Sequence, residues 1–225
     1  MGNFSKSPGT VLAQNQSKGY VGIHIEQGVP VLDRDLNLMH DFLASGVRGL
    51  LAKYIGDGAI GGGFQIQATI LANNFTINPG TAVVGGIEAT LLAKINYSDQ
   101  PGVPPLTTPI SARQDIVFLD VSLSEADSST DPDLSNSDDV GVQTSVREKV
   151  NWVVRVAEGA TSAPTPAAGH FNITLARINR SLGIPTIGAA MITDLRKLII
   201  PLVDLTVLVK TLSTYGATGV NIGLI

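Results

Sequence analysis

Residues 33–55 have the spacing of one long amphipathic helix. Apolar side chains recur there at intervals of three and four, which puts them on one face of a helix. They are Leu36, Met39, Leu43, Val47, Leu50 and Tyr54, and Phe42 and Leu51 widen this stripe. Asp33 is a residue type that caps helix starts, and Gly56 stands where a glycine commonly ends a helix. We predict that the six stripe residues form an interface, where the small residues Gly46 and Gly49 allow close approach of another helix.

The chain carries few charges for its length. Charged residues make up 15% of its 225 residues, against about 25% in ordinary globular domains, while 44% are hydrophobic. A lone monomer normally needs more charge on its surface, so we interpret much of this surface as facing neighbouring chains in an assembly. A neutral surface rich in Ser, Thr, Asn and Gly is the alternative interpretation.

Composition also bears on the class of function. The net charge of −4 and the pI near 5.3 provide no basic footprint for nucleic acid. The absence of cysteine excludes disulfides, thiolate metal sites and cysteine nucleophiles. No apolar run opens the sequence, so no secretory signal is expected. A membrane span over 187–209 is not expected either, because charges and a proline interrupt it. They are Asp194, Arg196, Lys197, Pro201 and Asp204.

The N-terminal part of the chain divides into two predicted regions. Residues 1–19 are rich in Ser, Gly and Gln, which is typical of a flexible arm or of an element that orders only on a partner. Residues 20–60 form a predicted strand–turn–helix assembly element. The strand is predicted over 20–26, where apolar and polar residues alternate, and Gly28 and Pro30 mark the turn.

Residues 61–182 change to period two, which predicts an antiparallel β domain. Strands are expected at 64–67, 81–84, 87–95, 115–121, 142–156 and 171–178, and loops at 98–109 and 124–141. Residues 183–225 are predicted as a C-terminal extension or arm, with strand or short helix at 192–200 and a strand-prone run at 202–211. The predicted fold class is mainly β with one long N-terminal helix (α+β), as an antiparallel β sandwich or barrel-like domain with extended terminal arms.

Two runs have the residue types of ligand sites, and each has a simpler interpretation. GDGAIG at 56–61 matches GxGxxG, but a dinucleotide site needs a strand before it and a helix after it, and the predicted order here is the reverse. An EF-hand beginning at Asp131 would have Asn136 and Val142 where glycine and glutamate are required. An irregular Ca²⁺ site in this loop stays open beside a solvated loop. The loop carboxylates are Asp127, Asp131, Asp133, Asp138 and Asp139.

No catalytic constellation is found in the sequence. There is no GxSxG elbow, and Asp33 and Asp35 would not face each other on a helix. No metal-ligand spacing links the three histidines, which are His24, His40 and His170. We therefore predict no catalytic, cofactor or metal residues and no enzyme. Trp152, on the apolar side of its predicted strand, is expected to anchor the core.

Two stretches resemble a family of proteins encoded with phage tails and contractile injection systems. EQGVPVLDRDLN at 26–37 is similar to the family's QQGRxxLDADWN. SARQDIVFLDV at 111–121, DPDL at 131–134 and WVVRV at 152–156 resemble its YLDVWERxV…EDPxL…TRxxxxWQVRV. Order and spacing agree, and the apolar and turn positions persist where residues differ. ITDLR at 192–196 is similar to a shorter IxDxR element of tail-fibre and baseplate proteins.

This resemblance implies a structural component of a contractile phage-tail-like particle, in or next to the baseplate, spike or cap. Its role would be subunit assembly or fibre attachment. The implied partners are other tail or baseplate subunits and copies of the chain itself, as a trimer or hexamer, with no nucleic acid and no direct membrane span. Assembly would take place in the bacterial cytoplasm. The alternative is a carbohydrate- or cell-surface-binding module of the same particle, a class that usually displays exposed aromatic residues.

Overall fold

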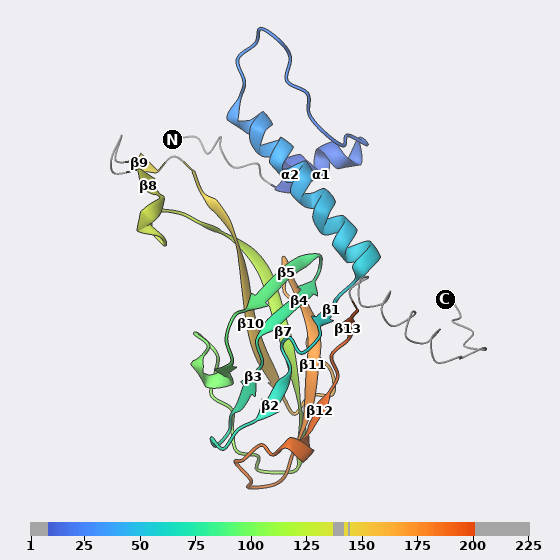
Figure 1. Ribbon diagram of the computed structural model, residues 1–225, viewed down its shortest axis with the longest axis vertical. Helices are drawn as coiled ribbons and strands as arrows, with labels where there is room; N and C mark the ends of the chain where they lie inside the picture. Colours follow the sequence, from blue (N-terminus) through green and yellow to red (C-terminus); the bar gives the residue numbers. More distant parts are fainter. Residues whose placement is uncertain (1–8, 137–141, 144, 201–225) are drawn as a thin grey trace, which may run out of the picture.

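The computed structural model describes residues 9–136, 142–143 and 145–200 (Figure 1). Two helices near the N-terminus adjoin a β body, by which we mean the described residues from 57 to 200. The protein is mostly β, with several antiparallel sheets and one long helix, which confirms the predicted α+β class. Among the described residues, no helix combines the length and apolarity needed to cross a membrane.

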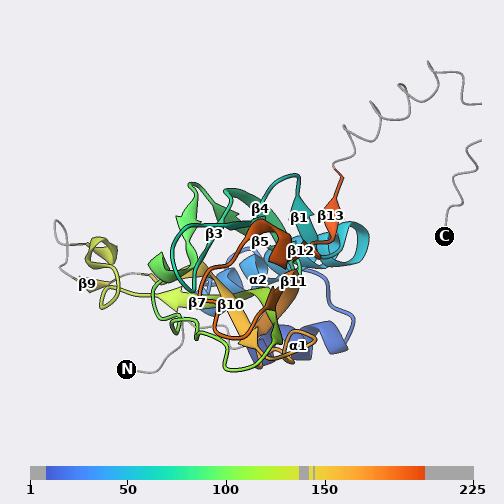
Figure 2. The same ribbon diagram turned by 90° about the horizontal axis from the view of Figure 1, so that it is seen from below.

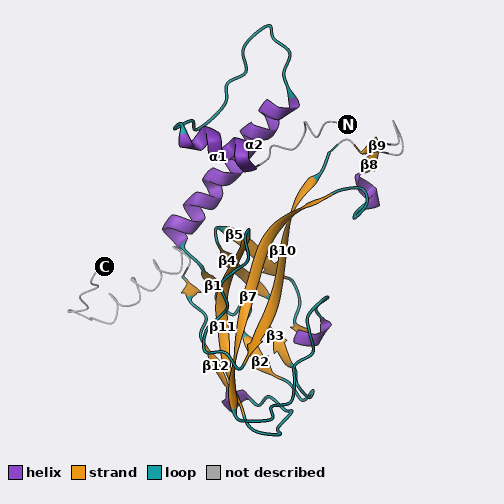
Figure 3. Ribbon diagram, turned by 180° about the vertical axis from the view of Figure 1, so that it is seen from behind, coloured by secondary structure: helices purple, strands orange, loops and turns teal. Residues whose placement is uncertain are grey.

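The longest strands form a four-stranded antiparallel sheet in the order β10-β7-β11-β12. They are β7 (Arg113–Ala126), β10 (Arg147–Glu158), β11 (His170–Arg180) and β12 (Ile192–Asp194). Pairing between β7 and β11 stops at Ser122, whereas β7 and β10 stay paired to Ala126. Strands β7 and β10 therefore project beyond β11 as a two-stranded ribbon (Figure 3). Its tip carries η3 (Pro132–Leu134), β8 (Ser135–Asn136) and β9 (Val142–Gln143).

Shorter strands form two further sheets. The first has the order β13-β1-β4-β5, in which β13 and β1 are parallel and the other pairs are antiparallel. Its strands are β1 (Gly58–Ile60), β4 (Gly80–Val84), β5 (Ile87–Leu91) and β13 (Leu198–Ile199). The second comprises β2 (Ile66–Ala68), β3 (Phe75–Ile77) and β6 (Ile95–Asn96). Two 3-10 turns, η2 (Tyr97–Asp99) and η4 (Ala189–Met191), complete the β body.

These three sheets contribute to one hydrophobic core. In β7 the alternate residues Val117, Leu119 and Val121 belong to this core, because every second side chain of a strand lies on the same face. Figure 2 shows the two layers, with β1 and β4 on one side and β7, β10 and β11 on the other. Trp152 packs edge-to-face on Phe64, with 5.2 Å between ring centroids and 87° between planes. Trp152 is partly buried and packs against the core, as its predicted anchoring role requires.

The predicted helix over 33–55 is confirmed as α2 (Asp33–Leu50) continued by one π-helical turn, η1 (Leu51–Ile55). Gly56 ends it at a φ of 78°, and its N–H donates to the Leu51 carbonyl at 2.8 Å. The predicted cap was wrong. Leu32 holds the N-cap position without a side-chain bond, and Asp33 lies one residue later, inside the first turn. There its negative charge still favours the helix dipole.

Two predictions for the N-terminal region were wrong. Residues 20–26 form no strand, because no described strand lies beside them to pair with, and Val21 stays 89% exposed. The predicted arm contains helix α1 (Gly9–Ser17), so α2 is the second helix and not the first element of the chain.

The described part of the predicted C-terminal extension joins the sheets. Within 192–200, β12 pairs with β11 and β13 pairs with β1, so strand is the outcome of the two options left open for this run. The strand-prone run 202–211 and the tail after it lie outside the described residues.

Helix α2 meets the β body at the turn between β4 and β5. Gly85 and Gly86 form this turn with φ values of 61° and 74°, which confirms the predicted hairpin. A Cβ on Gly86 would overlap the Arg48 carbonyl oxygen, so the helix backbone lies directly against the glycine. The turn thus needs glycine both for its left-handed conformation and for this close approach.

We expect Gly86→Ala to lower the free energy of unfolding by about 1–2 kcal/mol more than Gly102→Ala does. Both glycines have a φ near 74° (74° and 73°), but only an alanine at Gly86 would meet α2, since nothing lies within 4 Å of a Cβ on Gly102. Urea unfolding followed by circular dichroism measures the difference. Equal losses in the two variants would show that α2 does not rest on this turn in solution.

Candidate functional site

The six predicted interface residues all lie exposed on α2 and η1. Their exposed fractions are 47% for Leu36, 38% for Met39, 68% for Leu43, 58% for Val47, 58% for Leu50 and 80% for Tyr54. We call this set the α2 stripe. A row of six accessible apolar side chains on one helix face is unusual for a surface that only meets water. Its use as an interface stays a prediction.

A second apolar side of α2 is buried. Leu38 and Phe42 are 6% and 8% exposed, and they lie about 120° around the helix from the α2 stripe. Helix α1 packs against α2, and the Gln16 amide donates to the Ser45 hydroxyl at 3.1 Å. Phe42, which the sequence pattern assigned to the stripe, therefore belongs to the buried side. The helix has two apolar faces, and the described residues cover only one of them.

A groove of about 530 Å³ lies between the start of the α1–α2 connection and α2. Tyr20 and Val21 line one wall, and Tyr54 lies at the end where the α2 stripe finishes. Gly46 and Gly49 also line it, and a Cβ on either would find no atom within 4 Å. Two glycines one turn apart leave the helix backbone open, so another chain segment can approach it closely.

Polar contacts reinforce the attachment of α2 to the β body. The Arg48 guanidinium bonds the Glu148 carboxylate of the ribbon at 3.1 Å between Nη1 and Oε2. Both side chains are partly exposed, so this pair stabilises the contact by about 0.5 kcal/mol. The Asp57 carboxylate accepts the Gly85 N–H at 2.7 Å and fixes the turn under the helix. The α2 stripe is therefore presented beyond the β body on a helix held at its base (Figures 1 and 3).

The GxGxxG run has the order expected for a connector. Helix η1 ends directly before the run, and β1 (Gly58–Ile60) lies within it, so a helix precedes the glycines and no helix follows them, opposite to a dinucleotide site. A Cβ on Gly58 would lie 2.5 Å from the Lys197 carbonyl oxygen, because β13 packs against β1 at this point. This glycine is needed for strand packing.

The acidic loop uses its described carboxylates in turns. Asp127 accepts hydrogen bonds from the Ser129 amide and hydroxyl, and Asp131 accepts from the Asp133 amide at 3.2 Å. The Ser129 hydroxyl is the main reason that the pKa of Asp127 lies below its ordinary value. Among the described residues no group of three His, Asp or Glu side chains could share a metal ion, while Asp138 and Asp139 lie outside them. Ion binding by this loop stays a prediction.

The three histidines lie on different elements and do not form a cluster. His24 lies in the α1–α2 connection, His40 lies on α2, and His170 opens β11. His170 Nδ1 lies 2.8 Å from one oxygen of Asp120, whose other oxygen accepts from Arg155 Nε at 3.0 Å. A carboxylate can orient an imidazole in this way. Among the described residues, the His170 ring is bonded to this carboxylate.

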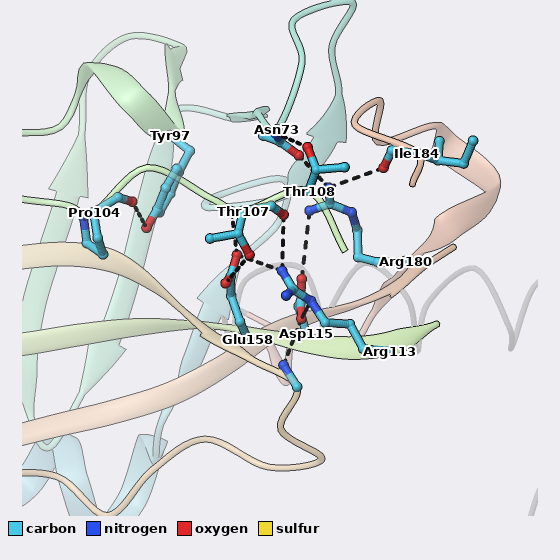
Figure 4. A network of polar contacts seen from close by, with 11 residues as sticks. Asn73, Tyr97, Pro104, Thr107, Thr108, Arg113, Asp115, Glu158, Arg180 and Ile184 are labelled. Atoms are coloured by element: carbon cyan, nitrogen blue, oxygen red, sulfur yellow. Dashed lines mark hydrogen bonds and ion pairs between the residues drawn. The ribbon is translucent and has the colours of Figure 1, made fainter. Parts of the chain in front are cut away.

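Sequence reasoning missed a polar network at the far end of the β body (Figure 4). The Asp115 carboxylate is 1% exposed, accepts the Gly159 N–H at 2.8 Å and lies 2.9 Å from Arg113 Nε. Arg180, whose side chain is fully buried, lies 3.7 Å from the other Asp115 oxygen. The sequence signal was the charge at strand ends, because Arg113 and Arg180 are direct partners in the β7–β11 register.

The network joins three loops. Arg180 Nη2 donates to Asn73 Oδ1 at 2.6 Å and to the Ile184 carbonyl at 3.4 Å. The Asn73 amide in turn donates to the Thr108 hydroxyl at 2.8 Å. The loops after β2, before β7 and after β11 are therefore fixed to one another by a buried cation. Burial lowers the pKa of Arg180 from its ordinary value, and the Asp115 carboxylate opposes this shift.

Glu158 completes the network at the end of β10. Its oxygens accept from the Thr107 amide and hydroxyl, both at 2.7 Å, and Arg113 Nη2 lies 2.7 Å from Oε1. Burial raises the pKa of Glu158, but the hydrogen bonds from Thr107 and the charge of Arg113 outweigh it, so that this pKa lies below its ordinary value. Two arginines face two carboxylates here, and this charge balance is typical of a structural network.

Comparisons with known proteins give distant structural likeness only. No protein-family model matches the chain, and no curated protein matches it. Among solved structures, TssK aligns with a TM-score of 0.42 and 10% identity over 74% of this chain and 40% of that one. A chain of the baseplate complex from the type VI secretion system aligns with a TM-score of 0.44 and 6% identity over 88% of this chain and 65% of that one. This chain thus spans less than two thirds of either length, and the likeness is too weak to assign it a function.

We expect Glu158→Gln to lower the free energy of unfolding at pH 7 by about 1–2 kcal/mol, since it removes the charge that pairs with Arg113. A carboxyl whose folded pKa is depressed stabilises the fold above its unfolded pKa of 4.5, and this stability is lost as pH falls through the folded pKa. The gap between wild type and Glu158→Gln should therefore close below about pH 4. Denaturant unfolding at pH 7, 5 and 3 measures it.

Thr107→Val is the matched variant, because it removes one hydroxyl and keeps every charge. Its loss should be about 1 kcal/mol, and it should persist wherever Glu158 stays ionised. A gap between wild type and Glu158→Gln that is constant from pH 7 to 3 would contradict the assigned role of Glu158.

Proposed function

We propose that this chain is a non-enzymatic structural subunit of a contractile phage-tail-like particle, in or next to its baseplate, spike or cap. The observation that carries the proposal is the α2 stripe, which projects from the β body with all six residues exposed. Burying such a row against another subunit removes apolar area from water at about 25 cal/mol per Å². We infer that the stripe is the surface by which this subunit joins its neighbours.

The residues that carry the family resemblance lie where this role needs them. EQGVPVLDRDLN at 26–37 forms the turn that enters α2 and its first residues. The second stretch supplies β7 and β10, including Val154 in the core and Trp152 packed against it. One part of the pattern thus builds the presented helix, and the other builds the body that holds it. This supports membership of the contractile-system family as our proposal.

The proposed partners are other tail or baseplate subunits and further copies of this chain, as a trimer or hexamer. A flat helix face with Gly46 and Gly49 beside it suits helix–helix packing around a symmetry axis. Assembly would take place in the bacterial cytoplasm, and the subunit would remain in the particle afterwards. The two sheet layers would act as the rigid sandwich that positions the helix.

A second candidate function rests on two exposed aromatic rings. Tyr20 and Tyr54, 54% and 80% exposed, both line the groove beside α2, as aromatic residues do in carbohydrate sites. A carbohydrate- or cell-surface-binding module would bind a glycan array in a manner that Tyr54→Ala abolishes. Glycan binding without any self-association or incorporation would favour this candidate over assembly.

We expect Leu43→Asp to reduce incorporation into particles and self-association at least tenfold, because it places a charge at the centre of the α2 stripe. Leu50→Asp should act in the same way. Since Leu43 is 68% exposed in the single chain, the free energy of unfolding should change by about 0.5 kcal/mol or less. Native mass spectrometry of the purified protein and subunit counts in purified particles measure the effect.

Ile70→Asp is the matched control, because Ile70 is 96% exposed and lies on the β2–β3 loop, away from α2. It should assemble like wild type. Particles of normal composition built from Leu43→Asp protein would overturn the assignment of the stripe as the joining surface.

A further inference from the structure

Three loops meet at the end of the β body opposite α2 (Figures 1 and 3). They are the loops after β2, before β7 and after β11, at 69–74, 104–112 and 181–188. The Gly183 N–H donates to the Pro109 carbonyl at 2.8 Å. The Asn73 N–H donates to the Pro185 carbonyl at 2.7 Å. Three loops that are distant in sequence therefore form one continuous surface.

Five aliphatic side chains of these loops are exposed. Ile70 and Ile110 are 96% and 92% exposed, so each stands almost entirely in water. Leu71, Leu182 and Ile184 are between 41% and 63% exposed. We call these five side chains the apolar tip. Exposed apolar side chains that gather on one surface mark a place where another molecule is contacted.

The buried Arg180 network holds the apolar tip in one arrangement. Arg180 Nη2 donates to Asn73 Oδ1 at 2.6 Å and to the Ile184 carbonyl at 3.4 Å. The Asn73 amide donates to the Thr108 hydroxyl at 2.8 Å. Each loop is thus bonded within two residues of an exposed side chain of the tip. A surface that is ordered in advance loses less conformational entropy when it binds.

The three loops contain no charged residue. The apolar tip can therefore leave water without taking an ion with it, a step that costs far more than apolar burial returns. The loops also offer no cation to a phosphate and no carboxylate to a basic surface. The surface that matches them is apolar and has no net charge.

The size and composition of the apolar tip favour a lipid surface over a protein. A stable protein interface takes about 20–30 residues from each side, and its energetic anchors are mostly Trp, Tyr and Arg. The tip offers five side chains, all of them Leu or Ile. Lipid binding depends instead on the apolar area that reaches the boundary between headgroups and acyl chains.

We propose that the apolar tip inserts its aliphatic side chains into the interfacial layer of a lipid bilayer that has no net charge. The loop backbone stays at the level of the headgroups, because irregular backbone is not tolerated in hydrocarbon. This inference goes beyond the proposed function. The α2 stripe and the tip lie at opposite ends of the molecule, so a subunit joined through α2 still presents the tip (Figure 1).

Flotation with phosphatidylcholine vesicles tests the contact in the purified full-length chain. Wild type should float with the vesicles. Ile70→Asp and Ile110→Asp should each lower the partition coefficient about tenfold, because a charge replaces a side chain that enters the bilayer. Val21→Asp is the matched control, since Val21 is 89% exposed in the α1–α2 connection at the other end of the molecule. It should bind like wild type.

Three outcomes would contradict the proposal. The first is an absence of wild-type binding, and the second is equal binding by wild type and both tip variants. The third is binding that Leu43→Asp abolishes, which would assign the lipid contact to the α2 stripe.

A fluorescent label reports insertion directly. Because the chain has no native cysteine, Ile110→Cys and Val21→Cys can each carry one dye that responds to its surroundings. Vesicles should shift the emission of the dye at position 110 to the blue and leave the dye at position 21 unchanged. Since the loops are uncharged, the bound fraction should stay constant between about 0.1 and 1 M salt. A bound fraction that falls steeply with salt would refute a neutral contact.

This inference and the proposed function fail in different ways. Vesicle binding together with normal assembly of Leu43→Asp would keep the lipid contact and refute the joining surface. Loss of assembly in Leu43→Asp without vesicle binding by wild type would do the reverse. Ile70→Asp should lose vesicle binding and still assemble, whereas loss of its assembly would place a protein partner at the apolar tip and overturn the lipid assignment.

Discussion

The contact between the Arg48 carbonyl and Gly86 determines where helix α2 is attached to the β body. Helix α2 extends past the β body, and its base at Arg48 lies against the β4–β5 turn. Any side chain on the glycine would separate the two. With the backbone seated there, the helix direction is set by the hairpin, which is in turn fixed through Asp57. The α2 stripe is thus held in place and left exposed by the described residues.

The opposite end of the β body is organised by buried charge. Arg180 and Asp115 lie inside it with partners on three loops, and Glu158 adds a carboxylate at the end of β10. Removing Asp115 would leave the charge of the fully buried Arg180 without its carboxylate partner, which costs several kcal/mol. This network keeps the loops in one arrangement, so that the β body is a rigid base for the helix.

The apolar side chains of the chain lie in two separate places, the core of the β body and the α2 stripe. The alternating residues of β7 and the ring of Phe64 lie in one core, against which the partly buried Trp152 packs. The α2 stripe contributes nothing to that core. A low proportion of charge and an apolar helix face that the described residues leave exposed therefore go together in this chain.

The sequence alone determined the helix over 33–55, its glycine end, the β4–β5 hairpin and most of the long strands, because these depend on local spacing and on turn chemistry. It also identified the six stripe residues, since periodicity shows which side chains share a face. Tertiary structure decided which apolar face is buried, because Phe42 and Leu43 are both apolar and lie on different faces of α2, and only packing determines which face is covered. It also decided that residues 20–26 form no strand, because a strand needs a neighbouring strand to pair with. The charges of Asp115, Glu158 and Arg180, which are distant in sequence, meet in one network only in the folded protein.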